Sequence, residues 1–286
     1  MKIKELLNRN QITVSCEIFP PKKEVEFSGI FEIVDKINTL PVDFISVTYG
    51  AGGSTSKKTV EVAKYIQAAH RKPALAHLTC CEATREQISE RLAVFRENGI
   101  DNILALRGDY PKDYSGNGDY QYAVELIRDI KRQGDFCVGA ACYPEGHVEC
   151  EHKEDDISFL KEKVDAGCDF LTTQMFFDNN VYYNFLYRVM AKGVQIPVIP
   201  GVMPVTNSRQ IKRTCELSGT VLPARFKAIA DKFSDDPKAM QQAGIAYATE
   251  QIIDLVANGV KYVHLYTMNR PEIAAKIMEN LSEILK

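Results

Sequence analysis

Short runs of apolar and β-branched residues alternate along the chain with amphipathic stretches of helical length. This alternation is typical of a parallel sheet whose strands are joined by helices. The runs that have the length and composition of strands are residues 12–19, 43–50, 74–80, 102–108, 137–144, 170–177, 197–204 and 262–268. Eight strands with helices between them predict a closed (β/α)₈ TIM barrel, which we expect to form one domain over residues 1–286.

Helices are expected after each strand. They are predicted to begin near Glu24, Ser56, Thr84, Asp119, Glu154, Asn179, Thr206 and Arg270. Thr84 and Gln87 have the spacing of a capping box. The segment between the seventh and eighth strands is longer than one helix needs, and Pro223 separates it from a second run at 236–258, so an extra helix is expected there. A doubly wound open sheet is the competing fold, but the first turn, EIFPPKKE, lacks the glycines typical of that fold.

Alternation within the strands identifies side chains that face the barrel interior. Ser15 and Glu17 alternate with apolar neighbours in the first strand, as do Ser46 and Thr48 in the second and His77 and Thr79 in the third. In the fourth strand we expect Leu104 and Leu106 to face the helices. Active sites of such barrels lie at the carboxyl ends of the strands, so a polar pocket is predicted at that mouth. Its expected members are Glu17, Thr48, His77, Arg107, Asp109 and Gln174.

Composition narrows the partner to a small molecule. The net charge is −3 with both signs mixed along the chain, which argues against nucleic acid and anionic membranes as partners. The charged start MKIKELLNRNQ has no apolar core of signal-peptide length, and no run approaches the ~20 apolar residues of a membrane span. A cytoplasmic protein is expected. Its eight cysteines lie mainly in strand-like runs and are expected to be reduced and buried.

Three further features each have a functional and a structural interpretation. Glu17 is either an acid with a raised pKa or a strand-end partner of a basic residue. Cys142, His147, Cys150 and His152 suggest zinc, but their spacing matches no usual zinc pattern, so no metal is expected. The third feature is TYGAGGST, whose glycines offer either a phosphate cradle or an ordinary loop. They are Gly50, Gly52 and Gly53.

A series of motifs resembles the methylenetetrahydrofolate reductases over nearly the whole chain. In order they are SCEIFPPK, FISVTYGAGGS, AHLTC, ILALRGD, AACYPEGH, KEKVDAG, TTQMFFD, IPGVMPVTN and HLYTMNR. The resemblance implies a barrel that binds FAD noncovalently at its mouth. It also implies ping-pong reduction of 5,10-methylenetetrahydrofolate to 5-methyltetrahydrofolate, with NADH or NADPH as the usual co-substrate.

The resemblance also implies roles for individual residues. Glu17 corresponds to the general acid, and Asp109 to a catalytic carboxylate that contacts both flavin and folate. Further folate contacts are implied at Gln174, Gln210, Tyr266 and Arg270. Thr48 is implied near the nicotinamide. The implied FAD contacts are Tyr49, Ala51, His77, Arg107, Gly108, Asp109, Ala123, Tyr143, His147, Asp156 and Lys163.

The chain departs from the better-known bacterial members at Phe159, Glu162 and Thr214, the last where a nicotinamide-stacking Phe is usual. The electron source is therefore NAD(P)H or a partner subunit that delivers electrons, and a homo-oligomer is expected. Two alternatives remain at this point: a noncatalytic corrinoid- or folate-binding barrel, and a lyase or transferase acting on a phosphorylated substrate. Bound flavin distinguishes the reductase from both.

Overall fold

The computed structural model describes residues 1–21, 26–49, 55–110, 116 and 118–286, apart from the side chains of residues 55, 56, 153, 210 and 212. The described residues form nine strands. These are β1 (Thr13–Ile18), β2 (Phe44–Val47), β3 (Ala74–Thr79), β4 (Asn102–Leu106), β5 (Cys137–Cys142), β6 (Phe170–Thr173), β7 (Val198–Ile199), β8 (Gly201–Val202) and β9 (Tyr262–Tyr266). All pair in parallel, in the order β7-β6-β5-β4-β3-β2-β1-β9-β8.

The two ends of this sheet meet at Pro200. β7 pairs with β6 and β8 pairs with β9, and only Pro200 separates β7 from β8 in sequence. Proline has no N–H to donate to a neighbouring strand, so the single strand expected at 197–204 is divided in two. The carbonyl of Pro200 accepts from the backbone N–H of His264. The result is a nearly closed (β/α)₈ barrel, which confirms the expected fold class.

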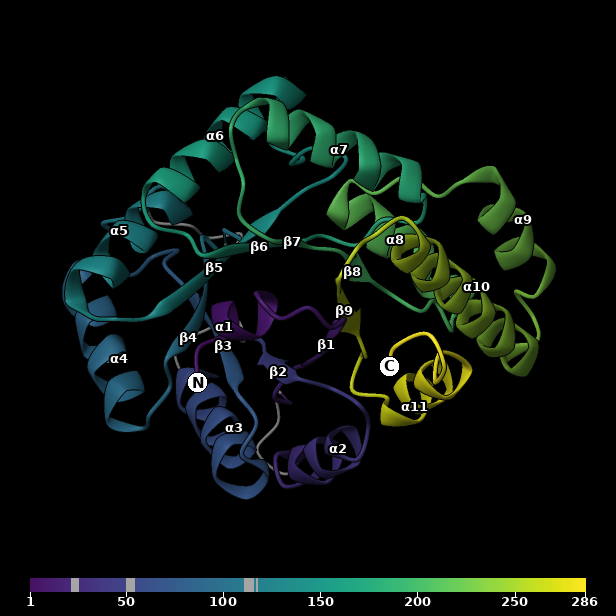
Figure 1. The fold of residues 1–286 in the computed structure, drawn as a ribbon, viewed down its shortest axis with the longest axis horizontal. Coiled ribbons are helices and arrows are strands. Elements are labelled where there is room, and N and C mark those ends of the chain that lie inside the picture. Colours follow the sequence, from purple (N-terminus) through teal and green to yellow (C-terminus); the bar gives the residue numbers. More distant parts are fainter. Residues whose placement is uncertain (22–25, 50–54, 111–115, 117) are drawn as a thin grey trace.

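Helices surround the strands in Figure 1. They are α2 (Gly29–Asn38), α3 (Thr55–His70), α4 (Arg85–Glu97), α5 (Ala123–Gln133), α6 (Lys153–Asp165), α7 (Asn179–Ala191), α8 (Ser208–Ser218), α9 (Ala224–Lys232), α10 (Pro237–Ala257) and α11 (Pro271–Asn280). The capping box of Thr84 and Gln87 is confirmed at the start of α4. The helix expected from Asp119 begins four residues later, and the start expected near Glu24 lies outside the described residues. Between β8 and β9 the extra helix is confirmed, and α9 adds a second one.

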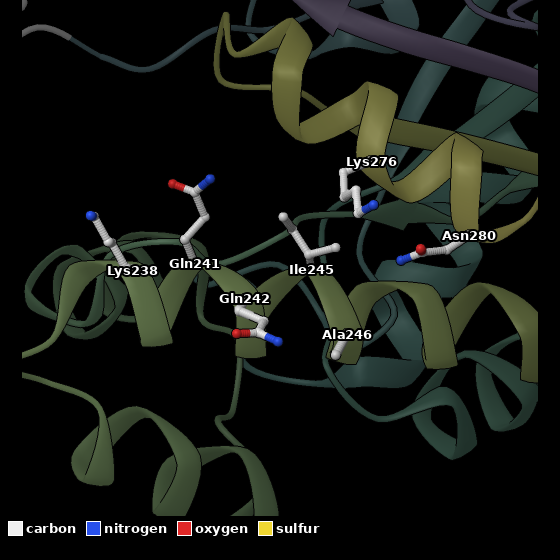
Figure 2. Close-up of a pocket in the computed structure, with 7 residues that line it drawn as sticks. All are labelled: Lys238, Gln241, Gln242, Ile245, Ala246, Lys276 and Asn280. Carbon is white, nitrogen blue, oxygen red and sulfur yellow. The ribbon is translucent and has the colours of Figure 1, made fainter.

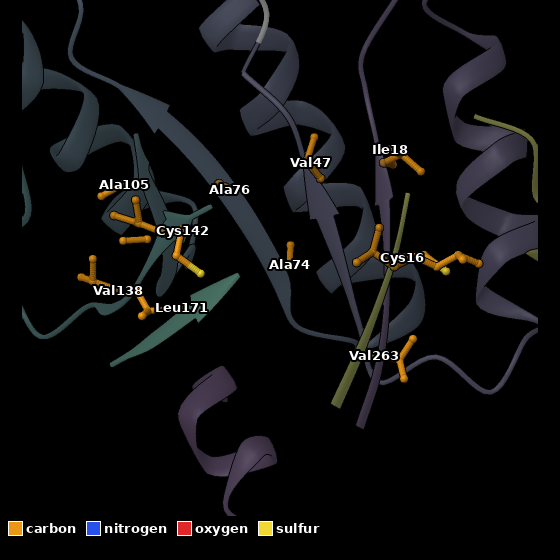
Figure 3. Close-up of a cluster of buried hydrophobic side chains, with 14 of the residues drawn as sticks. Cys16, Ile18, Val47, Ala74, Ala76, Ala105, Val138, Cys142, Leu171 and Val263 are labelled. Carbon is orange, nitrogen blue, oxygen red and sulfur yellow. The ribbon is translucent and has the colours of Figure 1, made fainter. Parts of the chain in front are cut away.

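Outward-facing strand residues form the main core with these helices. Cys16, Val47 and Ala76 are fully buried in this cluster, and Figure 3 shows their side chains with others from β4, β5 and β6. Alternation therefore identified the outward faces of β1, β2 and β3 correctly. The described helices include none long and apolar enough to cross a membrane.

A short helix, α1 (Ile3–Leu7), closes the amino-terminal end of the barrel. Its residues Ile3, Leu6 and Leu7 pack on inward-facing side chains to form a second apolar cluster, here called the floor. The strand members of the floor are Phe44, Leu75, Leu104, Cys137, Phe170 and Ile199. Asn102 ties the helix down, because its Oδ1 accepts the backbone N–H of Ile3 at 2.7 Å.

The floor corrects one prediction. Leu104 belongs to the floor and Leu106 packs against it, whereas Ile103 and Ala105 face the helices. The prediction that Leu104 and Leu106 face the helices was wrong because the lower barrel interior is itself apolar. Hydrophobicity therefore cannot distinguish the two faces of β4.

Candidate active site

Glu17 lies near the carboxyl end of β1 and is the centre of a polar cluster inside the barrel. Its Oε2 is 3.5 Å from Nε2 of His77 on β3 and 3.4 Å from Nε2 of His264 on β9. The Glu17 side chain is 19% exposed, whereas those of His77 and His264 are 7% and 2% exposed. The carboxylate is therefore the part of the cluster that a molecule in the mouth can reach.

Two serines hold the two imidazoles. Ser46 Oγ is 2.8 Å from Nε2 of His77, and Ser15 Oγ is 2.8 Å from Nδ1 of His264. The Ser15 hydroxyl also donates to the carbonyl of Val263 at 3.3 Å. Each imidazole thus contacts one serine and Glu17, so its orientation is determined by neighbours on β1 and β2 for His77 and on β1 for His264.

The electrostatics of Glu17 combine opposing effects. Burial acts to raise its pKa, but the hydrogen bond with His264 and the electrostatic interactions with the two imidazoles lower it, and the pKa lies below its ordinary value. Burial lowers the pKa of His77 to about 4, so this imidazole is neutral at neutral pH. Glu17 is therefore ionised at neutral pH, contrary to the interpretation of Glu17 as an acid with a raised pKa.

The loops after β4 and β5 form a second group of expected residues. Arg107 makes a bidentate ion pair with Glu149, at 2.5 and 2.8 Å, and its guanidinium stacks over the ring of Tyr110 at 4.5 Å. Gly108 adopts φ +86°, a conformation that glycine tolerates best. Because the chain turns here, Arg107 and Asp109 belong to the loop and not to an alternating strand face. Asp109 is exposed.

His147, Asp156 and Lys163 lie beneath this loop. Asp156 Oδ2 accepts the backbone N–H of His147 at 3.3 Å, and the ring of Tyr143 meets that of His147 edge-on at 4.6 Å. Lys163 Nζ donates to the carbonyl of Ala141 at 3.0 Å. Burial raises the pKa of Asp156 and lowers that of Lys163, so both groups are held in a partly dry environment.

Tyr266 interacts electrostatically both with Glu17 and with Tyr143, which lies beside His147. Burial raises its pKa well above the ordinary value, and the negative charge of Glu17 acts in the same direction. Its hydroxyl donates to the carbonyl of Thr173 at 2.7 Å. Gly201 permits this approach, since a Cβ there would lie 2.6 Å from the Tyr266 ring. Gln174, the residue after Thr173, is half-buried at the same end of the barrel.

Arg270 lies at the rim, with its guanidinium directed by three elements. It donates to Thr206 Oγ1 at 2.7 Å, to Gln241 Oε1 at 2.8 Å and to Glu272 Oε1 at 2.9 Å. Arg270, Thr206 and Gln241 line a cavity of about 360 Å³ beside α10, and no described contact joins Arg270 to Glu17. The structure therefore places Arg270 apart from the Glu17 cluster.

The remaining expected residues follow the strands or begin helices. Thr48 and Tyr49 are half-buried after β2, and Ala123 begins α5. Ala51 lies outside the described residues, as do the three glycines of its loop and the side chain of Gln210. Cys142 points into the outer core, away from His147, and the described residues contain no group of three or more His, Cys, Asp or Glu side chains suited to a metal.

His264 is the principal residue that sequence reasoning missed. It occurs in the motif HLYTMNR, yet only Tyr266 and Arg270 of that motif were assigned. The signal was available, because Val263 and Leu265 alternate with His264 and are buried outward. The same parity that identified His77 therefore identifies His264 as an inward residue.

The sequence was compared with known proteins. A sequence model of the family described as methylenetetrahydrofolate reductase matches residues 2–282. The chain is 35% identical to 5,10-methylenetetrahydrofolate reductase of Escherichia coli, over 96% of this chain and 92% of the relative. It is also 35% identical to methylenetetrahydrofolate reductase (NADH) 1 of Arabidopsis thaliana, over 99% of this chain. The chain spans half the length of that plant relative.

Among solved structures, a protein from Clostridium thermocellum that binds two copies of 5-methyl-5,6,7,8-tetrahydrofolic acid has a TM-score of 0.66. The match covers 100% of this chain and 99% of the other at 13% identity, so it supports the fold alone. A 2,3-dimethylmalate lyase shares the fold more distantly, with a TM-score of 0.55 at 12% identity over 98% of this chain and 85% of the lyase. The match over residues 2–282 and the 35% identity to the bacterial enzyme show that the chain belongs to the methylenetetrahydrofolate reductase family.

Proposed function

We propose that this chain reduces 5,10-methylenetetrahydrofolate to 5-methyltetrahydrofolate by ping-pong turnover, with bound FAD and with NAD(P)H or a partner subunit as electron source. The observation that carries the proposal is Glu17, a carboxyl group held between two imidazoles at the mouth of a barrel of this family. A positioned acid is what the folate requires, because protonation opens its bridged ring and makes the one-carbon unit electrophilic.

Bound FAD would supply the hydride chemistry that links the electron source to that one-carbon unit. We propose that FAD is held by the residues that the family resemblance implies as its contacts. These are Tyr49, Ala51, His77, Arg107, Gly108, Asp109, Ala123, Tyr143, His147, Asp156 and Lys163. The Tyr49 hydroxyl supports this, because it is buried and has no hydrogen-bond partner among the described residues, and a polar ligand would provide one. Arg107 and Lys163 are basic side chains on neighbouring elements and suit the phosphates of a dinucleotide.

His264 is suited to deliver a proton to Glu17. It lies between Ser15 Oγ at 2.8 Å and Glu17 Oε2 at 3.4 Å, so a proton on Nε2 has a short path to the carboxylate. The backbone of Glu17 is held as well, because Thr267 Oγ1 donates to its carbonyl at 2.6 Å. These contacts keep the acid in one position beneath the mouth.

Protonation of Glu17 near neutral pH requires further desolvation. Burial already acts to raise its pKa, and the effects of the imidazoles act against it. His77 is neutral at neutral pH, because its pKa is about 4, so its charge does not oppose protonation there. Substrate that covers the remaining 19% of exposed side chain removes water from the carboxyl and raises its pKa further.

We assign Asp109, Gln174, Gln210, Tyr266 and Arg270 to the folate. Asp109 is exposed in the loop after β4, whereas Gln174 and Tyr266 lie half-buried at the strand ends. One mouth serves the electron donor and the folate in turn, which is the basis of the ping-pong proposal. We assign Thr48, the residue after β2, to the nicotinamide.

The experiment begins with the purified protein. Denaturation should release FAD, metal analysis should find no stoichiometric zinc, and anaerobic NADH or NADPH should bleach the flavin band. Methylenetetrahydrofolate should then restore the band and yield 5-methyltetrahydrofolate. Bleaching by neither nucleotide, with restoration after chemical reduction, would identify a partner subunit as the electron source. Zinc without flavin, or flavin that methylenetetrahydrofolate does not reoxidise, would contradict the proposed function.

A further inference from the structure

The hydroxyl group of Ser15 determines which nitrogen of His264 carries a proton. Ser15 lies on β1 two residues before Glu17, is 1% exposed, and donates to the carbonyl of Val263 at 3.3 Å. A serine hydroxyl has a single hydrogen, so towards Nδ1 of His264, 2.8 Å away, the same oxygen acts as an acceptor. Nδ1 of His264 therefore carries a proton, and Nε2 is the nitrogen that faces Glu17.

This tautomer makes the contact between His264 and Glu17 depend on one further proton. If Nε2 is unprotonated and Glu17 is ionised, two acceptors face each other at 3.4 Å and neither can donate. One added proton removes the conflict, whether it lies on Nε2 or on the carboxyl oxygen. When that proton moves to Glu17, one N–H bond breaks and one O–H bond forms. Nδ1 stays protonated throughout, and Ser15 accepts from it in both forms.

His77 has the same kinds of neighbour in a different arrangement. Its Nε2 faces both Ser46 Oγ, at 2.8 Å, and Glu17 Oε2, at 3.5 Å. The serine and the carboxylate thus share one nitrogen of His77, whereas they occupy opposite nitrogens of His264. Only the second arrangement lets one nitrogen keep its proton on a serine while the other exchanges a proton with the carboxylate. The geometry therefore favours His264 over His77 as the proton source of Glu17.

The other groups that face His264 leave this exchange undisturbed. The ring of Tyr266 meets the imidazole edge-on at 5.1 Å, but its hydroxyl donates to the carbonyl of Thr173. Burial raises the pKa of Tyr266 well above the ordinary value, so the hydroxyl keeps its hydrogen. Burial lowers the pKa of His77 to about 4, so that ring is neutral at neutral pH. Among the described residues of this cluster, Glu17 and His264 are therefore the pair that exchanges a proton.

We propose that Ser15 is a positioning residue for the folate step, because it holds one proton of His264 on Nδ1 and thereby directs the proton on Nε2 to Glu17. This rests on the proposed function, in which Glu17 passes that proton to the folate. Solvent restores the proton after the product leaves, through the 19% of the Glu17 side chain that is exposed. Ser15 acts on the reaction only through His264.

Ser15→Ala tests this role. Without an acceptor at Nδ1, neutral His264 adopts the other tautomer, whose Nε2–H binds Glu17 and is not released, because its loss would leave an imidazolate. Flavin oxidation by methylenetetrahydrofolate should slow roughly 10- to 100-fold, as expected when one hydrogen bond to a charged group is lost. The rate should also begin to fall at a lower pH than in the natural chain. Flavin reduction by the electron donor should keep its rate, and Ser15→Thr, which retains the hydroxyl, should restore both the rate and the pH profile.

Two further variants serve as controls. Ser46→Ala removes the serine of the other imidazole and should leave the pH at which the folate step declines where it is. Gln242→Ala removes an exposed amide from the groove between α10 and α11 that Figure 2 shows, and both half-reactions should keep their rates. The role of Ser15 is excluded by an unmoved pH profile in Ser15→Ala, by equal slowing of its two half-reactions, or by equal behaviour of the Ala and Thr variants.

Nuclear magnetic resonance of the imidazole nitrogens tests the tautomer without catalysis. His264→Gln identifies the His264 signals by their loss. In the natural chain Nδ1 should carry the proton and Nε2 should titrate, whereas in Ser15→Ala the neutral ring should carry its proton on Nε2. A neutral ring protonated on Nε2 in the natural chain would overturn the role of Ser15. This result does not depend on turnover, so it separates failure of this proposal from failure of the reductase proposal.

Discussion

The floor and the mouth of the barrel are built from the same strands, yet their side chains differ completely. On β2 the inward residues change from Phe44 to Ser46, and on β3 from Leu75 to His77. Each change takes two residues, about 7 Å along a strand. At the level of Phe44 and Leu75 the interior is apolar and covered by α1. At the level of Ser46 and His77 it holds a carboxylate and two imidazoles. Packing and chemistry are thus separated along the barrel axis.

This separation indicates what substitutions at each end should do. Floor side chains are buried against each other and stabilise the fold through the hydrophobic effect. Mouth groups lose hydration on folding and are held by specific partners, so their contribution is to the reaction and not chiefly to stability. Substitution at the mouth should therefore change rates, and substitution at the floor should change the free energy of unfolding.

Glu17→Gln should produce the largest effect and should separate the two half-reactions. The amide keeps the size of the side chain but removes the acid, so oxidation of the flavin by methylenetetrahydrofolate should slow by ~10²–10⁴. Flavin reduction by the electron donor should remain nearly as fast. Rapid-mixing absorbance follows each half-reaction separately.

Asp109→Asn provides the contrast, because a residue assigned to both flavin and folate should alter both steps. Equal slowing of both half-reactions in Glu17→Gln would point to misplaced flavin, and an unaffected folate step would eliminate Glu17 as the acid.

Phe170→Ala tests the floor. The ring of Phe170 is fully buried and occupies the space that Gly139 leaves open, since a Cβ at Gly139 would lie 2.5 Å from it. Its loss should lower the free energy of unfolding by ~3–5 kcal/mol, as measured by urea titration. Phe159→Ala on α6 is the control, because that ring is 53% exposed and its loss should cost less than ~0.5 kcal/mol. Similar losses in both variants would contradict the distinction between floor and surface.

The free energy of unfolding should depend on pH through the titration of His77 and Glu17 at the mouth. Burial lowers the pKa of His77 to about 4, below the ~6.5 of an unfolded chain, so the unfolded state binds this proton more readily. Stability should therefore fall as pH decreases from about 6.5 to about 4, by up to ~3 kcal/mol. The lowered pKa of Glu17 adds a loss of the same sign at more acid pH. Denaturant titrations at several pH values measure this slope.

His77→Gln should flatten the slope, whereas replacement of the exposed His152 by Gln should preserve it. An unchanged slope in His77→Gln would show that other groups cause the acid sensitivity.

Thr214→Phe should give the smallest effect, at the rim. Thr214 lies on α8, at the position where the family resemblance implies an aromatic ring stacked on the nicotinamide. An aromatic contact is worth ~0.5–1.5 kcal/mol, so flavin reduction by NADH should accelerate roughly 2- to 10-fold. Stopped-flow absorbance measures the rate, with Thr214→Val as the variant that lacks both hydroxyl and ring. If Phe and Val behave alike, the missing ring does not limit the use of NADH.

The sequence by itself determined the barrel and much of its mouth. The polar residues Glu17, Ser46 and His77 alternate with apolar residues in their strands. Because successive side chains of a strand point to opposite faces, this alternation identifies the face that each residue occupies. The capping box at Thr84 was equally readable, because it depends on residues three positions apart. Local patterns were reliable wherever one face of an element was polar and the other apolar.

The tertiary structure alone decided what depends on distant residues. The sequence could not show which side chains of β4 face the barrel interior, because the interior and the helix side are both apolar there. Helix α1 is part of the floor through its contacts with Asn102 and Cys137, which are distant in sequence. The sequence also could not show that the pKa of Glu17 is lowered, since that requires His264, 247 positions away, within 3.4 Å. Electrostatic energy depends on separation in space, and closure of the barrel between β1 and β9 is what makes that separation small.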